Sequence, residues 1–433
     1  MAGNLTSRMT APAVREAIPP EDSNPLLASI PPVPSLQEAM AMTEEQYLDV
    51  DLTGLSNTEI VARQSAGAII TDADRARILI NLIGQVRSSY RDRDLRMSDY
   101  RNYVHETNTF LHRRRNTQGH EFPSLYGIAP RARSRGNIVA MPVRMGRRSF
   151  ASAIESVIGR GPVVTRVETA NGFTEYLQLR TLRMNWPIGG KTTGWTQNFI
   201  GAFDCAFQTE YAKTTRSPLF RERDSLPAIC ALAVVSHLGL LIVERINVED
   251  TRTDAADSTW GAIAQFTRMT GIPVLCLPTP GAAVLSLSNL SGSVGDLTSG
   301  GIVEFSPPGK SSDNRWIVIC RTQFAATLGV AGIEEMPDWF PDAAYELTLG
   351  YPGLLSKVLV GIAQHLISAN VRSFDERLFK KYAERILVLD QHHIDSIKDI
   401  RKGGSYRPST LIRHGDWLSF GELASTHLKA EIH

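Results

Sequence analysis

Short apolar runs alternate with longer amphipathic segments between Asn137 and Leu277, and this pattern limits the chain to few folds. The longer segments, at about 148–158, 192–209, 225–237 and 257–270, have helical periodicity. Apolar strands separated by helices are typical of a parallel sheet covered on both faces. We therefore predict an α/β fold whose strands lie at 138–143, 163–167, 176–184, 239–243 and 273–277.

The segment 192–209 carries aromatic residues at every fourth position from Trp195 to Phe207. One aromatic stripe on a helix suits either packing in a core or stacking on nucleic-acid bases. We favour core packing, since buried aromatic faces are much the commoner use of such a stripe.

The regions on either side differ in composition. Residues 1–60 are rich in Pro, Ala, Ser and acidic residues, which predicts an extended arm. Residues 290–315 are rich in Gly and Ser and predict a loop or hairpin. Beyond Pro341 the pattern predicts helix almost to Gly403, with one apolar stripe from Leu354 to Leu366. We expect an N-terminal arm at 1–60, a helical Arg-rich region at 61–136, an α/β core at 137–330, and a helical lid with a tail at 331–433.

Charge and cysteine content say little about partners. The 46 basic and 45 acidic residues give a net charge of +1, so only local charge is informative. The longest apolar stretch, 228–243, falls short of the roughly 18 to 20 residues that span a bilayer, so we expect no membrane contact. Cys205, Cys230, Cys276 and Cys320 lie too far apart for a paired-cysteine metal site and suit a reducing cytoplasm.

No motif predicts a metal centre or a catalytic triad. His392 and His393 lie on a polar helix without ligand spacing, which predicts a surface pair. We therefore assign no catalytic residue and no metal ligand from the sequence.

Two stretches have the outline of a phosphate-binding loop, and neither is intact. A P-loop needs a first glycine, then four residues, then Gly-Lys-Ser/Thr. Before Gly189 to Thr192 the first glycine is replaced by Asn185, which favours a tight strand-to-helix turn. In the second stretch the first glycine is Met141 and the end reads Gly146-Arg147-Arg148-Ser149, where a planar guanidinium replaces a compact ammonium.

Taken in order, several segments resemble the TnsC/TniB family of AAA+ transposition proteins. The resemblance covers roughly residues 24–400 in pieces and rests on the order of its motifs. They are NPLLASIPP at 24–32, LIGQVRSSYRDRDL at 82–95, MNWPIGGKTTGWTQNFIGAFDCAF at 184–207, LGLLIVERIN at 238–247, TGIPVLCLPTP at 270–280 and YELTLGYPGLLSKVLVGIAQHLI at 345–367.

The resemblance implies a P-loop NTPase (AAA+)-like parallel sheet with flanking helices and an α-helical lid. It places the phosphate loop at 141–149 and makes Gly189 to Lys191 a strand-to-helix turn. In that register Arg147 stands for the lysine, and Arg148 for the hydroxyl residue unless Ser149 takes its place.

The same register shows further departures from the family pattern. The Asp-Glu pair that ends the apolar strand is Glu244-Arg245, and Thr279 stands at the sensor position. Glu244 keeps a carboxylate that could hold Mg²⁺, but Arg245 puts a cation where a carboxylate should orient the attacking water. The resemblance thus implies a pseudo-ATPase, or a protein that binds ATP and Mg²⁺ without turnover.

Arginine is concentrated between Arg87 and Arg148, with fourteen Arg, no Lys and five acidic residues. Such a local excess could follow a nucleic-acid backbone, although interleaved Asp residues also fit a solvated face or intersubunit ion pairs. Our candidates for DNA contact are Arg113, Arg114, Arg115, Arg131, Arg133 and Arg135.

We therefore expect a transposition regulator that assembles on DNA through backbone contacts and couples a target-selection factor to the transposase. It would form a homo-oligomer or join an active relative. One alternative is an active P-loop ATPase that uses Arg147, or Gly190 to Thr192, in a non-standard loop. The other is a protein-interaction scaffold without DNA binding.

Overall fold

The computed structural model describes residues 24–48, 51–67, 72–112, 135–169, 172–213, 222–287, 290, 292–403 and 408–424. Its centre is a five-stranded sheet with strand order β4-β5-β6-β1-β7, in which every pairing is parallel. The strands are β1 (Gly136–Ala140), β4 (Thr181–Asn185), β5 (Leu240–Ile246), β6 (Val274–Pro278) and β7 (Gly301–Glu304).

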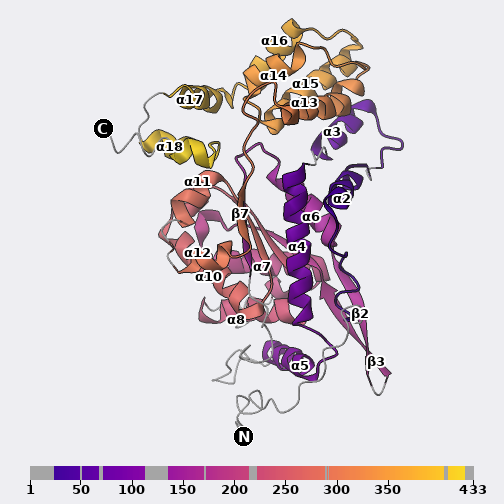
Figure 1. The fold of residues 1–433 in the computed structure, drawn as a ribbon, viewed down its shortest axis with the longest axis vertical. Coiled ribbons are helices and arrows are strands. Elements are labelled where there is room, and N and C mark those ends of the chain that lie inside the picture. Colours follow the sequence, from indigo (N-terminus) through magenta and orange to yellow (C-terminus); the bar gives the residue numbers. More distant parts are fainter. Residues whose placement is uncertain are drawn as a thin grey trace.

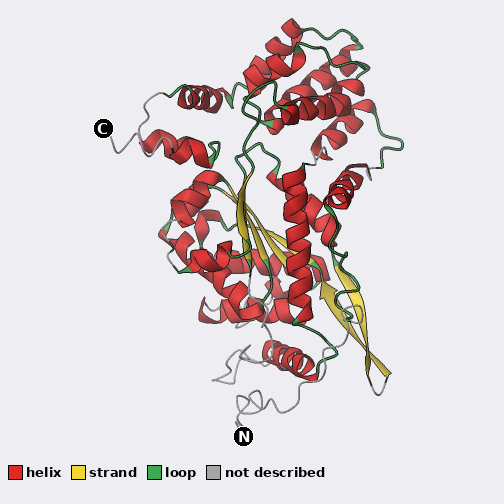
Figure 2. Cartoon of the chain, viewed as in Figure 1, coloured by secondary structure: helices red, strands yellow, loops and turns green. Residues whose placement is uncertain are grey.

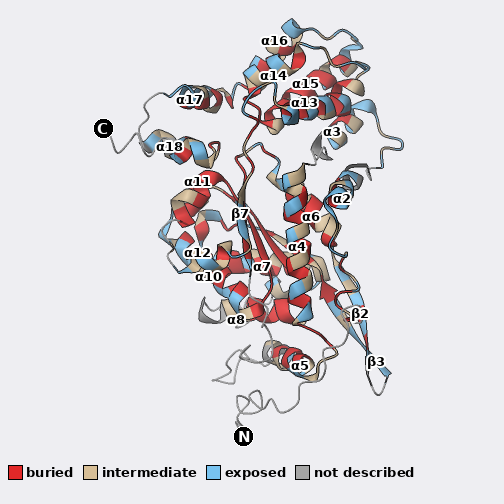
Figure 3. Cartoon of the chain, viewed as in Figure 1, coloured by how far each residue is buried: buried red, intermediate tan, exposed pale blue. Residues whose placement is uncertain are grey.

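Helices cover both faces of this sheet (Figure 2). Strand side chains alternate between two apolar clusters: Ile242 and Leu275 point to one, and Val243 and Cys276 to the other. The central strands β1 and β6 are buried throughout, as expected for a parallel sheet between helical layers, whereas the edge strand β7 is exposed or half-buried (Figure 3). The first cluster contains α4 (Ala73–Arg91) and α6 (Arg147–Ile158), and the second α7 (Thr192–Phe207), α8 (Glu222–Val235), α10 (Asp254–Thr270) and α12 (Ser293–Thr298).

The aromatic stripe of α7 confirms the core-packing prediction. Trp195 and Phe199 are fully buried, and both rings contact Phe266 of α10, with centroids 6.3 and 6.1 Å away. The stripe is therefore part of the second apolar cluster and offers no stacking surface for bases.

Helices at the other end of the chain form the lid. They are α13 (Asn314–Phe324) with the π-helical turn η6 (Ala325–Gly329), α14 (Phe340–Thr348), α15 (Pro352–Ala369), α16 (Glu376–Ile386) and α17 (Gln391–Arg401). Figure 1 shows α13 to α16 gathered at one end of the molecule, so the lid begins before the predicted boundary at 331. The architecture is otherwise the predicted one: a parallel sheet with flanking helices, followed by a group of lid helices.

Helix α15 is apolar in composition. Among the described residues, it is the one helix whose length and mean hydropathy would allow it to cross a membrane. Its stripe from Leu354 to Leu366 is buried among other lid helices, which accounts for the composition. We read it as the core helix of the lid.

The N-terminal region departs from the predicted extended arm. The helices α2 (Leu36–Leu48) and α3 (Asn57–Gly67) lie within or across the stretch 1–60, and α5 (Ser98–His112) follows α4. Pro31 to Pro34 ends just before α2, so the prolines limit where helix starts without preventing it. Helix α3 packs against α15, which joins this region to the lid.

The predicted strand at 176–184 is wrong as a single element. It is two strands, β3 (Gly172–Leu179) and β4, separated at Arg180. β3 pairs antiparallel with β2 (Pro162–Thr169), so 163–167 also lies outside the parallel sheet. This two-stranded hairpin projects from the core (Figure 1).

The predicted loop or hairpin at 290–315 is also wrong in part. Helix α12 and the parallel edge strand β7 occupy its first half. Five short elements complete the described part of the core: the 3-10 turns η2 (Ile188–Gly190) and η3 (Tyr211–Lys213), α9 (Val248–Thr251), α11 (Pro280–Ala282) and the π-helical turn η5 (Ala283–Leu287). Near the C-terminus, α18 (Pro408–His414) leads into a segment at 415–424 that returns to the core.

Candidate functional site

The carboxyl ends of β1, β5 and β6 meet at one edge of the sheet and define the site. After β6 the chain crosses β1 and forms β7 on its other side. In open parallel sheets, ligands bind beyond the strand ends at such a crossing point. The turn between β1 and α6 lies there, and this is the stretch 141–149 that the sequence singled out.

Backbone geometry shapes this turn. Met141 continues the sheet, because its N–H donates to the Pro278 carbonyl at 3.0 Å. Arg144 and Gly146 have positive φ angles of 66° and 87°, and α6 begins at Arg147 without a side-chain cap. The first N–H groups of a helix lack intrahelical acceptors and carry partial positive charge, so they can bind an anion.

Arg147 does not extend freely into this space. One terminal nitrogen of its guanidinium donates to the carbonyls of Ile246, at 3.1 Å, and Leu277, at 3.4 Å. The other donates to Asn247 Oδ1 at 2.7 Å. Burial lowers the pKa of Arg147, against the opposing effect of nearby Asp416 and Glu244. The guanidinium is thus bound to acceptors at the strand ends, and it reaches them from two nitrogens, whereas the three donors of a lysine all lie on one nitrogen.

Glu244 lies at the end of β5 and is also engaged. Its carboxylate accepts a hydrogen bond from Arg183 at 2.8 Å, and only 7% of the residue is exposed. Arg183 further approaches Glu155 of α6 at 3.6 Å. The carboxylate is therefore neutralised by a cation from β4.

The next residue, Arg245, lies at an irregularity of the sheet. The pairing of β5 with β6 shifts register between Val243 and Ile246, and Arg245 has a φ of 60°. A β-bulge of this kind redirects a side chain, and a left-handed arginine persists only where its surroundings hold it. Arg245 is exposed, whereas Glu244 beside it is buried.

Thr279, the sensor candidate, is fully buried behind the turn. Its hydroxyl donates to Asp416 Oδ1 at 2.5 Å and accepts from the N–H of Ala282. Asp416 Oδ1 also accepts from Val248 N–H, and the Asp416 carbonyl accepts from Val143 N–H, both at 2.8 Å. The C-terminal segment is therefore anchored to β6, α9 and the β1–α6 turn.

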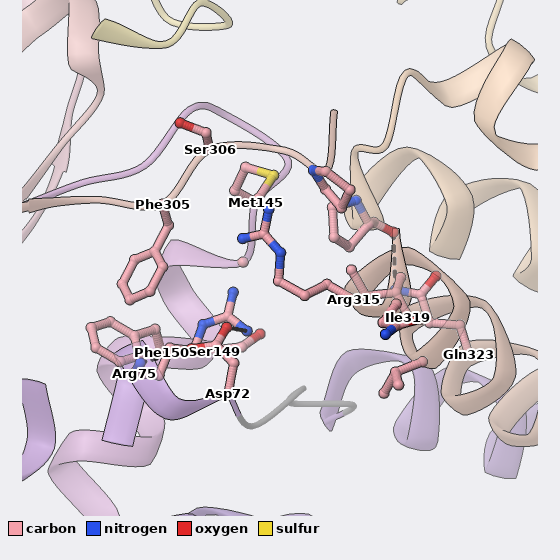
Figure 4. A pocket seen from close by; sticks show the side chains of 15 residues that line it. Asp72, Arg75, Met145, Ser149, Phe150, Phe305, Ser306, Arg315, Ile319 and Gln323 are labelled. Carbon is pink, nitrogen blue, oxygen red and sulfur yellow. Dashed lines mark hydrogen bonds and ion pairs between the residues drawn. The ribbon is translucent and has the colours of Figure 1, made fainter. Parts of the chain in front are cut away.

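Two neighbouring cavities open at the first turn of α6. The first, of about 250 Å³, is mostly apolar, and Figure 4 shows Phe150 and Phe305 on one side of it. Their rings meet edge to face at 5.7 Å, and the Arg75 guanidinium lies 5.1 Å from the centre of the Phe305 ring. Arg315 reaches across from α13 toward Met145 (Figure 4).

The second cavity, of about 380 Å³, is rich in arginine. Its charged lining residues are Arg144, Arg147, Arg148, Glu244 and Arg245. The two cavities share Gly146, Ser149, Gln323 and Pro352, so they are adjacent parts of one site.

Gln323 lies at the junction of the two cavities and has an unused acceptor. It is only 6% exposed, and its Nε2 donates to the Pro352 carbonyl at 3.0 Å. Its Oε1 is buried with no hydrogen-bond partner. A buried acceptor without a partner lowers the stability of the folded state, so this oxygen is available to accept a hydrogen bond from a ligand.

The structure brings together most of the residues that the sequence singled out for nucleotide binding. Gly146, Arg147, Arg148, Ser149, Glu244 and Arg245 all line the second cavity, but Thr279 does not. Sequence reasoning missed Arg75, Phe305, Gln323 and Asp416, since these come from distant segments that carry no motif.

The Gly189 to Lys191 segment is the strand-to-helix turn that the resemblance implied. Gly189 and Gly190 have positive φ angles, and a Cβ on Gly190 would lie 2.7 Å from the Asp250 carbonyl oxygen. Lys191 lines neither cavity. Glycine is thus required here for close packing on α9 and α10.

The DNA candidates are placed only in part. Arg113, Arg114, Arg115, Arg131 and Arg133 lie outside the described residues. Arg135 is exposed and precedes β1, at the end of the sheet opposite the cavities. Upstream, Arg93 is buried and donates to the Leu238 carbonyl, and Arg96 pairs with Asp94, so these two arginines serve the fold.

The residues at the site do not form a metal centre. Within the described ranges, no three His, Cys, Asp or Glu side chains are grouped so that they could hold a metal ion. Glu244, the one carboxylate among the described residues that line the second cavity, is paired with Arg183. The donor set therefore does not fit Mg²⁺.

Comparisons with known proteins give distant likenesses. No family model and no curated protein sequence matches the chain. Among solved structures, the Walker-type ATPase PABY2304 of Pyrococcus abyssi superimposes with a TM-score of 0.41 at 11% identity, covering 70% of this chain and 85% of that one. The ORC2 protein of Aeropyrum pernix, in ADPNP and ADP complexes, gives 0.40 at 12% identity, covering 69% and 79%.

The RuvB Holliday junction branch migration motor of Thermotoga maritima gives a TM-score of 0.37 at 12% identity, covering 69% of this chain and 79% of that chain. At these values we take no residue role from any of the three proteins.

Proposed function

We propose that this chain is an AAA+-like regulatory protein that binds a nucleotide and does not hydrolyse it. The observation that carries the proposal is the pair of adjoining cavities at the start of α6. The apolar cavity suits a base, the arginine-rich cavity and helix N-terminus suit phosphates, and Gln323 Oε1 suits a hydroxyl or amino donor between them.

Three side chains argue against turnover. Arg147 is bound to strand-end acceptors, Glu244 is paired with Arg183, and Arg245 places a cation beside the cavity. Hydrolysis requires a carboxylate or equivalent group to orient water, and phosphoryl transfer usually requires Mg²⁺ as well. Neither requirement is met by the groups at this site.

Thermal unfolding with added ATP tests binding. A ligand at 100 times its dissociation constant stabilises the folded state by about 2.7 kcal/mol, which should raise the melting temperature by a few degrees. We expect this rise together with no release of inorganic phosphate. Sustained phosphate release, or no rise at saturating ATP, would contradict the proposal.

The variant Gln323→Leu tests whether the cavities act as one site. It removes the unpaired acceptor, so ATP affinity should fall by up to about tenfold, since a net hydrogen bond contributes roughly 1 kcal/mol, and the lost bond to the Pro352 carbonyl should cost a similar amount of stability. Arg321→Gln, on the exposed side of the same helix, is the matched control. Equal affinity in both variants would separate Gln323 from the ligand.

The cellular role that we propose is regulation of DNA transposition in the cytoplasm. It rests on the resemblance of the six quoted segments and on the arginine-rich stretch from Arg87 to Arg148. The chain would assemble on the DNA backbone as a homo-oligomer or with an active relative, and would connect a target-selection factor to the transposase.

The triple variant Arg113→Gln, Arg114→Gln, Arg115→Gln tests DNA contact. Each phosphate contact that is lost should reduce the slope of log affinity against log salt by about 0.9. The matched control replaces three exposed arginines outside this cluster, Arg160, Arg166 and Arg252, with Gln. If the unaltered protein shows no salt-dependent DNA binding, the scaffold alternative is favoured instead.

The active-ATPase alternative makes its own prediction. If Gly190 to Thr192 bound phosphate, Lys191→Ala would abolish ATP binding. We expect no change, because Lys191 lines neither cavity.

A further inference from the structure

Two arginines of the second cavity are free to meet a ligand. Arg144 pairs with Asp390, and Arg147 is bound by Ile246 and Asn247. For the side chains of Arg148 and Arg245, by contrast, the described part of the chain supplies no hydrogen bond or ion pair, although both residues are exposed and line the cavity.

The acidic side of the cavity is already neutralised. Glu244 is the one carboxylate among the described lining residues, and Arg183 holds it at 2.8 Å. Four arginines therefore face the cavity without an unpaired carboxylate to balance Arg148 and Arg245. Such a surface attracts a polyanion and repels a divalent cation.

The backbone keeps Arg245 in this position. Its left-handed conformation lies at the register shift of β5, next to the buried Glu244. Non-glycine residues adopt this conformation at a cost, and strained residues cluster where they serve a site. Arg148 lies in the first turn of α6, so its side chain adds a full charge beside the free helical N–H groups.

We propose that this site binds a nucleoside di- or triphosphate without a metal ion, with Arg148 and Arg245 supplying the positive charge that Mg²⁺ supplies in other nucleotide sites. The proposal rests on the nucleotide binding proposed above and specifies its ligand as the metal-free nucleotide. Mg²⁺ neutralises two negative charges of the phosphates and competes with both guanidinium groups for the same phosphate oxygens. Magnesium should therefore weaken binding.

The test is calorimetric titration of the full chain with ATP, once in excess EDTA and once in excess magnesium. We expect affinity to be about tenfold or more higher in EDTA, which corresponds to about 1.4 kcal/mol. Tripolyphosphate, which lacks the base and sugar, should compete with ATP in EDTA, because the arginine-rich cavity recognises the phosphates.

The variants Arg148→Gln and Arg245→Gln identify the groups responsible. Each should lower affinity in EDTA by about tenfold and reduce the difference between the two buffers, because each removes a charged donor to the phosphate oxygens. Arg252→Gln, which replaces an exposed arginine outside both cavities, should bind as the unaltered chain does. Circular dichroism checks that each variant is folded. If a glutamine variant does not fold, Arg148→Lys or Arg245→Lys, which keeps the positive charge, replaces it in the titrations.

The outcomes separate the two proposals. Binding that is equal or tighter with magnesium, or that ignores both arginine variants, overturns metal-free binding and leaves the nucleotide site standing. Failure to bind in either buffer overturns the nucleotide site itself, and with it this inference.

Discussion

Arg147 shows how one side chain can connect the ends of two strands. Its guanidinium contacts Ile246, Leu277 and Asn247 with two nitrogens, which a single ammonium cannot reproduce in the same geometry. In the register that the family resemblance implies, this is the position of the phosphate-binding lysine, and here the side chain joins the ends of β5 and β6.

We predict that Arg147→Lys destabilises the protein without restoring ATP hydrolysis. Losing the contacts to the strand ends should lower the free energy of unfolding by about 1 to 3 kcal/mol. Hydrolysis should stay absent, because Glu244 remains paired and Arg245 is unchanged. Urea unfolding and phosphate release measure the two effects, with Arg160→Lys on the surface as control. Detectable turnover in the lysine variant would contradict the proposal that Glu244 and Arg245 also prevent hydrolysis.

Elements were predictable from the sequence where their pattern is local. Strands β1, β5 and β6 lie within a few residues of the predicted runs, because buried parallel strands have continuous apolar sequence. The run 176–184 gives no sign that one strand ends and another begins at Arg180, because the pairing of β3 with β2 and of β4 with β5 depends on residues distant in the sequence. Likewise Asp416, in a tail without pattern, reaches the site only through the folding of the whole chain.

The C-terminal segment is a structural element in its own right. Trp417 is buried against His393, with ring centroids 4.9 Å apart, and the Tyr351 hydroxyl donates to the Trp417 carbonyl. Arg401 pairs with Glu422 at 2.8 Å. The segment thus touches the lid through these residues and the core through Asp416.

We predict that Gly281→Ala releases this segment from the core. A Cβ at Gly281 would lie 2.5 Å from the Gly415 carbonyl oxygen, and the clash is with backbone, so the segment must move. Hydrogen exchange at 415–424 should become faster. Gly295→Ala in α12 is the control, because a Cβ there meets no neighbouring atom within 4 Å. Unchanged exchange in Gly281→Ala would mean that the segment is not anchored at this contact.

Acid should loosen the same element through His414. Its Nδ1 lies 2.9 Å from that of His393, so His393 of the predicted surface pair is half-buried and faces the buried ring of His414, whereas His392 is exposed. Burial is the main cause that lowers the pKa of His414 from 6.5 to about 4, and the nearby positive charges of His393, His392 and Arg413 add smaller effects in the same direction. The folded state therefore favours the neutral ring, and its stabilising effect is present above pH 6.5.

We predict that this contribution is lost as the pH falls from about 6.5 toward 4, because the unfolded chain then binds a proton that the folded chain excludes. The melting temperature of the unaltered protein should fall more between pH 7 and 5 than that of His414→Gln. Parallel pH profiles would exclude His414 as the titrating group.

At the scale of the molecule, core and lid share one interior. The first apolar cluster runs from α4 and α6 through the lid helices to Trp417 and Leu418, so the lid is not an independent unit on a hinge. One polar contact reinforces this junction. Asp390 accepts from Arg144 of the β1–α6 turn at 3.2 Å and from Lys357 of α15 at 2.7 Å.

We predict that Asp390→Asn opens the junction between lid and core. Asp390 is largely buried, and its replacement leaves Arg144 and Lys357 facing a neutral amide, so the free energy of unfolding should fall by about 1 to 3 kcal/mol. Urea unfolding measures this loss, and hydrogen exchange at 352–357 reports local opening. Asp338→Asn, at an exposed lid position, is the control. If Asp390→Asn matches this control, the apolar cluster alone holds the lid, and Arg144 is available to a ligand at no cost to the fold.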